Sequence, residues 1–269
     1  MNYRVDVIII GDSKNGHELL DKLATGNPKI NIAFISQAFK STTTHDYINV
    51  KYFRGEVEYL SYRHRMFNCY LKNKDIIFST HVIVASGVSY EPLMLNNEVV
   101  PNVYNNADDI PKIAKNQPAL VIYKQASDAK LALEVAKKYK QVYLCTKELD
   151  ITKDITKATA EKISKVENLV VLPNASVQKA ISENGALQKV ELDNYSRINC
   201  SAVFVKTDFK PATEFIPKKL VQKDEYGYLV VSDKAESTLV PKFFAAGNCA
   251  KKYTKAMDQQ IIETILNDF

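Results

Sequence analysis

The first residues whose types and spacing could serve chemistry form a short turn at residues 11–16, GDSKNG. A dinucleotide-binding turn uses three glycines: one makes the turn, one lets the backbone approach pyrophosphate, and one packs helix on strand. Gly11 and Gly16 are present, and Ser13 takes the middle position, where its hydroxyl can donate to phosphate. Asp12 adds a negative charge that Lys14 could offset. The turn therefore predicts either a nucleotide phosphate site or a plain strand-to-helix turn without ligand.

The residues that would meet a ribose follow the second expected strand. An acidic residue normally accepts the ribose hydroxyls at this place. Here Ser36 and Gln37 occupy it. Both can hydrogen-bond, although more weakly than a carboxylate.

A second turn of the same kind, at residues 123–129 (YKQASDA), contains no glycine. The side chains of Tyr123 and Gln125 would occupy the space that a pyrophosphate needs. After the next strand, only Lys147 offers a cation for a 2′-phosphate. We therefore expect this segment to keep its packing and not to bind NADH or NADPH in the ordinary way.

The cysteines are far apart and form neither a CxxC pair nor a metal-ligand spacing. The four of them are Cys69, Cys145, Cys200 and Cys249. This distribution predicts reduced thiols in a reducing, cytoplasmic compartment. The four histidines make no HExxH pattern, so no metal site is expected. Cys249 is interpreted as a buried apolar filler rather than a reactive thiol.

The elements that must position these residues alternate between strands and helices. Buried strands are expected at 5–10, 30–35, 82–85, 119–123, 141–145, 202–205 and 243–246, and helices at 17–24, 127–139 and 256–267. Strand–turn–helix–strand order defines βαβ units. Alternating apolar and polar residues over 51–78, 169–172 and 187–192 predict antiparallel, half-exposed ribbons, and a short strand is expected at 228–231. The fold class is α/β, with one βαβ domain (1–111 and 211–269) interrupted by another (112–210).

The bulk composition excludes several classes of protein. The 269 residues carry a net charge of +5, without a block of like charges, so nucleic-acid binding is not expected. The N-terminus lacks a signal-peptide layout and no apolar run reaches about 18 residues, so we expect no membrane segment. Glycine is scarce, at only 8 residues.

Several segments, in order along the chain, resemble the low-molecular-weight thioredoxin reductase group of FAD-dependent pyridine nucleotide-disulfide oxidoreductases. VDVIIIGDSKNG is similar to the first FAD turn, and Ser41–Thr44 with Asn49 is similar to a TTTTxxxN stretch lying against the flavin. VIVASGVSYEPL resembles the ATG segment, and KTDFKPATEFI the return from the inserted domain. GYLVVSDKAESTLVPKFFAAGNC resembles the closing FAD motif, with Gly247-Asn248 in place of Gly-Asp.

The resemblance implies two nested Rossmann-like domains, an FAD-type domain interrupted by an NAD(P)-type domain. The residues implied to bind FAD are Gly11, Ser13, Lys14, Gly16, Ser36, Gln37, Thr42, Thr44, Asn49, Ser86, Gly87, Gly247, Asn248, Thr254, Lys255 and Ala256. The N–H groups at the start of the last helix would face the pyrimidine edge of the flavin and stabilise negative charge there. The family's Y-C-x-x-C-D aligns with residues 104–109, where Asn105 and Asp108 replace the sulfurs.

The resulting hypothesis is a divergent flavoprotein oxidoreductase without a redox-active disulfide, because thiol–disulfide exchange needs an attacking and a resolving sulfur. No catalytic acid or base is assigned. Its partner would be a redox protein or a small-molecule acceptor, its electrons could come from a partner protein, and a homodimer is expected. The alternative is an inactive relative that keeps the two-domain shell as a binding or regulatory module.

Overall fold

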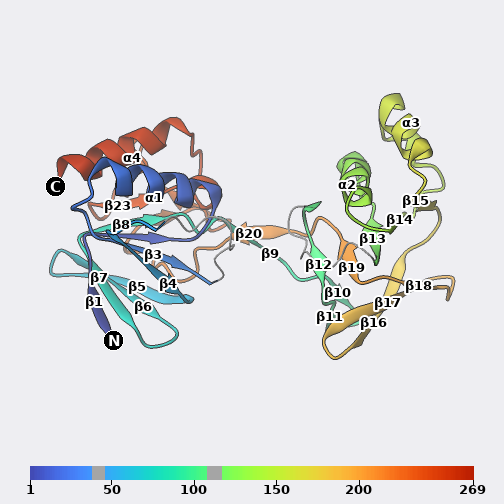
Figure 1. Cartoon of the computed structure of the whole chain (residues 1–269), viewed down its shortest axis with the longest axis horizontal. Coiled ribbons are helices and arrows are strands. Elements are labelled where there is room, and N and C mark those ends of the chain that lie inside the picture. The colour runs from blue at the N-terminus through green and yellow to red at the C-terminus, as the bar shows by residue number, and fades with distance from the viewer. Residues whose placement is uncertain (38–45, 108–116) are drawn as a thin grey trace. The chain divides into compact units, whose positions relative to one another are not determined.

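The computed structural model describes residues 1–37, 46–107 and 117–269. The chain divides into two units (Figure 1). The outer unit comprises Met1–Ser89 and Phe209–Phe269, and the inserted unit comprises Tyr90–Asp208. The first division falls at residue 89 rather than near 111. The reason is that β12 (Val103–Tyr104) pairs with β19 (Ala202–Phe204) of the inserted unit.

The outer unit is built on a five-stranded parallel sheet of order β23-β8-β2-β3-β4. Its strands are β23 (Phe243–Ala245), β8 (His81–Val84), β2 (Val7–Ile10), β3 (Ile32–Ser36) and β4 (Val50–Arg54). The assignment of residues 51–54 to an antiparallel ribbon is wrong. β4 pairs in parallel with β3. A strand at the edge of a parallel sheet also alternates buried and exposed residues, so its sequence looks like that of a ribbon strand.

The two faces of this sheet are covered by different layers (Figure 1). On one face, Val7 and Ile9 pack with α1 (Lys14–Gly26) and α4 (Ala256–Asn267). On the other, Ile8 and Ile10 pack with a second sheet, because successive side chains of a strand point to opposite faces. The second sheet has the order β1-β7-β6-β5, formed by Asn2–Arg4, Ile76–Ser79, Met66–Leu71 and Val57–Arg63. Its strands β5, β6 and β7 are the antiparallel ribbon expected from the sequence.

The inserted unit repeats the same three-layer design. Its parallel sheet has the order β12-β19-β13-β14-β15 and includes β13 (Pro118–Ile122), β14 (Gln141–Cys145) and β15 (Leu169–Leu172). α2 (Ala126–Ala136) and α3 (Lys157–Lys165) cover one face, and the antiparallel strands β16 (Val177–Glu183), β17 (Ala186–Leu192) and β18 (Arg197–Asn199) cover the other. β15 is a parallel edge strand and not a ribbon strand, while α3 and β16 have no counterpart in the sequence-based expectation.

Short elements complete the chain. They are β9 (Val88–Tyr90), β10 (Met94–Leu95), β11 (Glu98–Val99), β20 (Phe209–Pro211), β21 (Gln222–Lys223), β22 (Leu229–Val230), and the 3₁₀ turns η3 (Ile151–Lys153) and η4 (Gly247–Cys249). Among the described residues, no helix has the length and apolar character that a membrane crossing requires.

Candidate functional site

Parallel strands bring four sequence motifs to one edge of the outer sheet. Gly11 follows β2, Ser36 ends β3, Ser86 follows β8, and Gly247 follows β23. The carboxyl ends of parallel strands lie at the same edge, and β2 lies between β3 and β8, where the chain order reverses. Ligands of open α/β sheets bind outside such a switch point. The topology therefore brings Gly11, Ser36, Ser86 and Gly247 to the edge where this class of fold binds ligands.

Close backbone packing explains the two glycines of the turn. Gly11 has φ +105°, and a Cβ there would lie 2.4 Å from the carbonyl oxygen of Ala85. A Cβ on Gly16 would lie 2.4 Å from the carbonyl oxygen of Gly11. These distances are far below van der Waals contact, so the packing of α1 on the sheet requires glycine at both positions, with or without a ligand.

Ser13, the residue at the middle position, is the N-cap of α1. Its Oγ accepts a hydrogen bond of 3.2 Å from the backbone N–H of Gly16. Capping therefore uses the oxygen of Ser13, and only its hydroxyl hydrogen could serve a phosphate.

The turn at residues 11–16 and the segment at Gly247 approach each other closely at this edge. Gly247 has φ +73°, and a Cβ there would lie 3.0 Å from Oδ1 of Asn15. Asn15 and Gly247 are therefore close neighbours at the start of α1. Sequence reasoning gave no role to Asn15, because a contact over more than 200 residues leaves no local pattern.

A cavity of about 690 Å³ opens at this edge, entirely within the outer unit. Among the predicted residues, Gly11, Ser36, Gln37 and Ser86 line it. Its remaining walls come from Ile10, Asp12, Ile35, Gly55, Glu56, Val57, Glu58, Lys72, Val88, Ser89, Ala212, Glu214 and Phe215. The buried Oγ of Ser86 has no hydrogen-bond partner among the described residues. A cavity with both apolar and polar walls and an unpartnered hydroxyl, at a switch point, fits a ligand that carries hydrogen-bonding groups.

Four carboxylates and one amine give this cavity an acidic character. Asp12, Glu56, Glu58 and Glu214 line it, and Nζ of Lys72 lies 2.7 Å from Oε1 of Glu56. The sequence reasoning missed these walls, apart from Asp12, because β4 and β5 were assigned together to a ribbon. No acidic residue follows β3 in the sequence, but Glu56 and Glu58 lie close to its end. They are brought there because the N–H of Gly55 donates to the carbonyl of Ser36 at 2.8 Å.

Asn49 does not lie at this edge. Its Nδ2 donates to the carbonyl oxygen of Ile30 at 2.9 Å, and its own carbonyl accepts from the N–H of Ile32. Ile32 begins β3, whereas Ser36 ends it. The prediction that Asn49 binds the cofactor is therefore corrected: its side chain anchors the loop before β3 at the opposite end of the sheet. Thr42 and Thr44, predicted with it, lie outside the described residues.

The two predicted lysines are paired with an acid of α1. Nζ of Lys255 lies 3.2 Å from Glu18, and Nζ of Lys14 lies 4.0 Å from the same carboxylate. Neither lines the cavity, and Asn248, Thr254 and Ala256 are exposed. Gly87 adopts φ +67° and its carbonyl accepts from the N–H of Ala212. None of these predicted site residues is part of the cavity of about 690 Å³.

A buried carboxylate lies in the first turn of α4. Asp258 is almost completely buried, and Tyr253 donates a short hydrogen bond to its Oδ1. Burial, followed by the contact with Asp258, raises the pKa of the Tyr253 hydroxyl. The N-terminal end of α4 thus already contains a carboxylate, which offsets part of its positive dipole.

All four cysteines are free thiols in buried positions. Burial raises the pKa of Cys69 and of Cys200 to about 12, and that of Cys145 to about 11. Burial also raises the pKa of Cys249, whose Sγ lies 3.3 Å from the carbonyl oxygen of Ala246. Since the thiolate is the reactive form, these sites favour inert thiols, in agreement with the interpretation of Cys249 as a filler.

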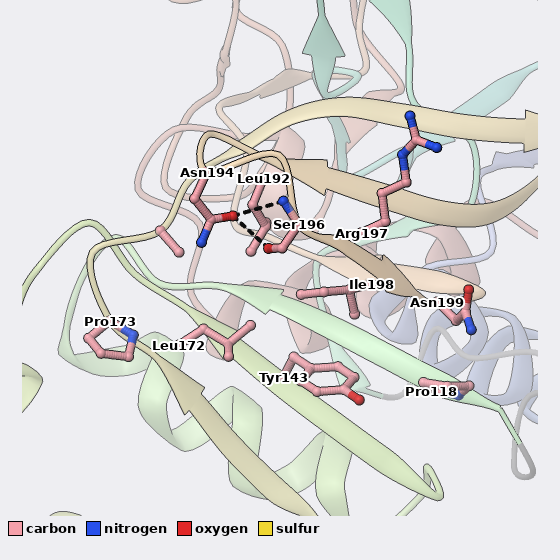
Figure 2. Close-up of a pocket in the computed structure, with 11 residues that line it drawn as sticks. Pro118, Tyr143, Leu172, Pro173, Leu192, Asn194, Ser196, Arg197, Ile198 and Asn199 are labelled. Carbon is pink, nitrogen blue, oxygen red and sulfur yellow. Dashed lines mark hydrogen bonds between the residues drawn. The ribbon is translucent and has the colours of Figure 1, made fainter.

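A separate cavity of about 400 Å³ lies in the inserted unit (Figure 2). Its walls are mixed: Tyr143, Leu172 and Ile198 are apolar, and Asn194, Ser196 and Asn199 are polar. Its one cation, Arg197, points away from these side chains in Figure 2 and pairs with Glu191 at 2.8 Å. The Oδ1 of Asn194 is used by the N–H and hydroxyl of Ser196. This cavity offers no arrangement for acid–base or redox chemistry.

A family model for pyridine nucleotide-disulphide oxidoreductases matches residues 10–247, and the chain belongs to this family. A search of the curated proteins finds no match. The α/β fold with two nested Rossmann-like units, predicted from the sequence, is confirmed by solved structures.

Among these structures is the thioredoxin reductase of T. acidophilum, with a TM-score of 0.69, 18% identity and 98% of each chain covered. Another is the thioredoxin reductase of Lactococcus lactis, with a TM-score of 0.68, 15% identity and 98% of each chain covered. A bacillithiol disulfide reductase from Staphylococcus aureus has a TM-score of 0.62 and 17% identity, with 99% of each chain covered. At these identities the likeness concerns the fold.

Proposed function

We propose that this chain is an FAD-binding oxidoreductase of its family that works without a redox-active disulfide. The observation that carries the proposal is the cavity of about 690 Å³ at the switch point of the outer sheet, lined by Gly11, Ser36, Gln37 and Ser86. It joins three of the motifs that resemble FAD-facing segments.

The residues of the cavity fit the adenosine end of FAD. Ser36 and Gln37 can hydrogen-bond the ribose hydroxyls, and Glu56 or Glu58 can supply the carboxylate that usually accepts them. The acidic lining suits neutral hydroxyls and repels an additional phosphate. This charge pattern therefore favours the adenosine moiety of FAD over a 2′-phosphorylated nucleotide at the same place.

The start of α1 would hold the pyrophosphate. Gly11 lets the backbone approach, and the helix N-terminus presents N–H groups to an anion. The η4 segment lies beside this helix start, since Gly247 is packed closely against Asn15. FAD, when bound, supplies the electron-transfer chemistry, and the chain supplies position and electrostatics.

The absence of a sulfur pair supports a route that avoids disulfide exchange. Asn105 stands at one sulfur position, and its Oδ1 accepts from the backbone N–H of Thr207 at 2.9 Å and from its hydroxyl at 3.2 Å. Asp108, at the other position, lies outside the described residues. An amide engaged in a structural contact cannot perform the exchange that needs two thiols.

A non-catalytic relative is the second candidate, and the cation arrangement favours it. Lys14 and Lys255 approach Glu18, and Lys72 pairs with Glu56. Three amines that could neutralise a pyrophosphate thus have carboxylate partners already. A two-domain protein that binds a smaller and less charged ligand than FAD would need no further cations.

The test is FAD binding to the purified full-length chain. We expect flavin bands at roughly 375 and 450 nm, as for protein-bound flavin generally. FAD at about 100 times its Kd should raise the free energy of unfolding by about 2.7 kcal/mol. A colourless protein whose stability does not change with excess FAD would contradict the proposal and favour the second candidate.

A matched pair of variants locates the site. Gln37 is exposed at the cavity, and Gln188 is exposed on β17 of the inserted unit. Gln37→Trp should fill the cavity and weaken FAD binding by about tenfold, equal to about 1.4 kcal/mol. Gln188→Trp, the same chemical change elsewhere, should leave the affinity unchanged. Equal affinities for both variants would place the flavin elsewhere.

A further inference from the structure

The turn between β13 and α2 is the place where the inserted unit would bind the pyrophosphate of a pyridine dinucleotide. Such a turn works by presenting backbone N–H groups to the phosphate at the helix N-terminus. In this chain two of these groups are already used. Oδ2 of Asp128 accepts from the N–H of Lys124 and from the N–H of Gln125, each at 2.9 Å.

Asp128 is part of the interior and not a surface cap. Its side chain is 1% exposed, and it stands in the first turn of α2, reaching back over the N-cap residue Gln125. Two charge-assisted hydrogen bonds hold the carboxylate in place. A phosphate that binds here would have to displace the Asp128 carboxylate from these two N–H donors. The negative charge of the carboxylate would also repel the phosphate.

The neighbouring cations are also engaged with the protein's own oxygens. Nζ of Lys206 donates to Oγ of Ser127 at 2.8 Å, and Nζ of Lys124 donates to the carbonyl oxygen of Lys206 at 3.3 Å. These contacts lie on the same turn that carries the carboxylate. Two N–H donors of the turn and the two neighbouring lysines are therefore engaged within the protein.

Tyr123 belongs to the same turn, and its side chain packs in the core of the inserted unit. It stands where a phosphate-binding turn has its first glycine, and it is 6% exposed. Removing the Asp128 carboxylate would free the N–H groups of Lys124 and Gln125.

We propose that Asp128 acts as an internal substitute for phosphate and closes the inserted unit to pyridine dinucleotides. The residues of this turn do not fit NADH or NADPH, although the family implies such a cofactor. The inference deepens the proposed function, because the flavin would then receive electrons by a route other than this unit. It rests on the family fold of the inserted unit and not on whether FAD binds.

The experiment measures NADP⁺ and ADP binding to the full-length chain by isothermal titration calorimetry. Asp128→Asn keeps the shape and one acceptor oxygen but removes the charge, and Asp128→Ala removes the acceptor. Glu134→Gln on the exposed face of α2 changes the net charge equally and is the control. Far-UV circular dichroism and thermal unfolding without ligand confirm that each variant is folded.

We expect no saturable binding up to about 1 mM in the wild type and in Glu134→Gln. Both Asp128 variants should bind at least about tenfold more tightly than the wild type, because a like charge facing the ligand has been removed. Wild-type binding as tight as that of Asp128→Ala would overturn the proposal. Absence of binding in every variant would also overturn it, since the exclusion would then come from the glycine-free turn alone.

Discussion

Replacing Gly16 by alanine should destabilise the outer unit, against the usual effect of this substitution in a helix. Alanine in a helix interior is normally more stable than glycine by about 0.5–1 kcal/mol. Here the new Cβ would lie 2.4 Å from the carbonyl oxygen of Gly11, whereas ordinary contacts begin at 3.4 Å. The backbone would have to move by about 1 Å to relieve this contact. Overpacking of this kind costs about 1–3 kcal/mol, so we expect a net loss of about 1–2 kcal/mol.

Gly26, at the other end of the same helix, provides the control. A Cβ there would lie 3.2 Å from Cδ1 of Leu266, the end of a flexible side chain that can move aside. Gly26→Ala should therefore change the stability by anything from zero to a gain of about 1 kcal/mol.

The assay is urea unfolding followed by circular dichroism and fitted with separate transitions, because two units need not unfold together. The inserted unit, which neither substitution touches, serves as the internal reference. A Gly16→Ala variant as stable as the wild type would refute the packing argument, and so would an equal loss in Gly26→Ala. The first result would leave ligand approach as the only reason for glycine at residue 16.

Two further predictions concern titratable groups. All four buried thiols should resist a disulfide reagent such as DTNB in the native state at pH 8, because burial raises their pKa values. All four should react after denaturation. Rapid reaction of Cys249 in the folded protein, or NADPH-dependent disulfide reduction that one Cys→Ser change abolishes, would show a redox centre. The His81 imidazole should titrate below pH 6.5 by NMR, because burial lowers its pKa despite the 2.9 Å contact with Asp268. Since the folded protein favours the neutral imidazole, this group should reduce stability as the pH falls below about 6.5, the unfolded pKa; a midpoint above 6.5 would contradict this.

The sequence by itself determined the elements whose pattern is local. The β-branched runs gave β2, β3 and β8, since strands buried on both faces leave a continuous apolar signal. The last helix was placed at its observed bounds, Ala256–Asn267, from its helical periodicity. The ordered motifs predicted the family, which the comparisons confirm.

Only the tertiary structure decided which residues meet. The alternation of β4 is the same in an antiparallel ribbon and at the edge of a parallel sheet, so its pairing with β3 required the fold. That pairing brings Glu56 and Glu58 to the cavity, while the bond from Asn49 to Ile30 takes Asn49 to the other end of the sheet. Likewise, the sequence shows that the turn at 123–129 has no glycine. Only the structure shows that the Asp128 carboxylate accepts from the N–H groups of Lys124 and Gln125 in this turn. Periodicity records which face of an element is buried; it does not record which distant or looped-back side chain completes a site.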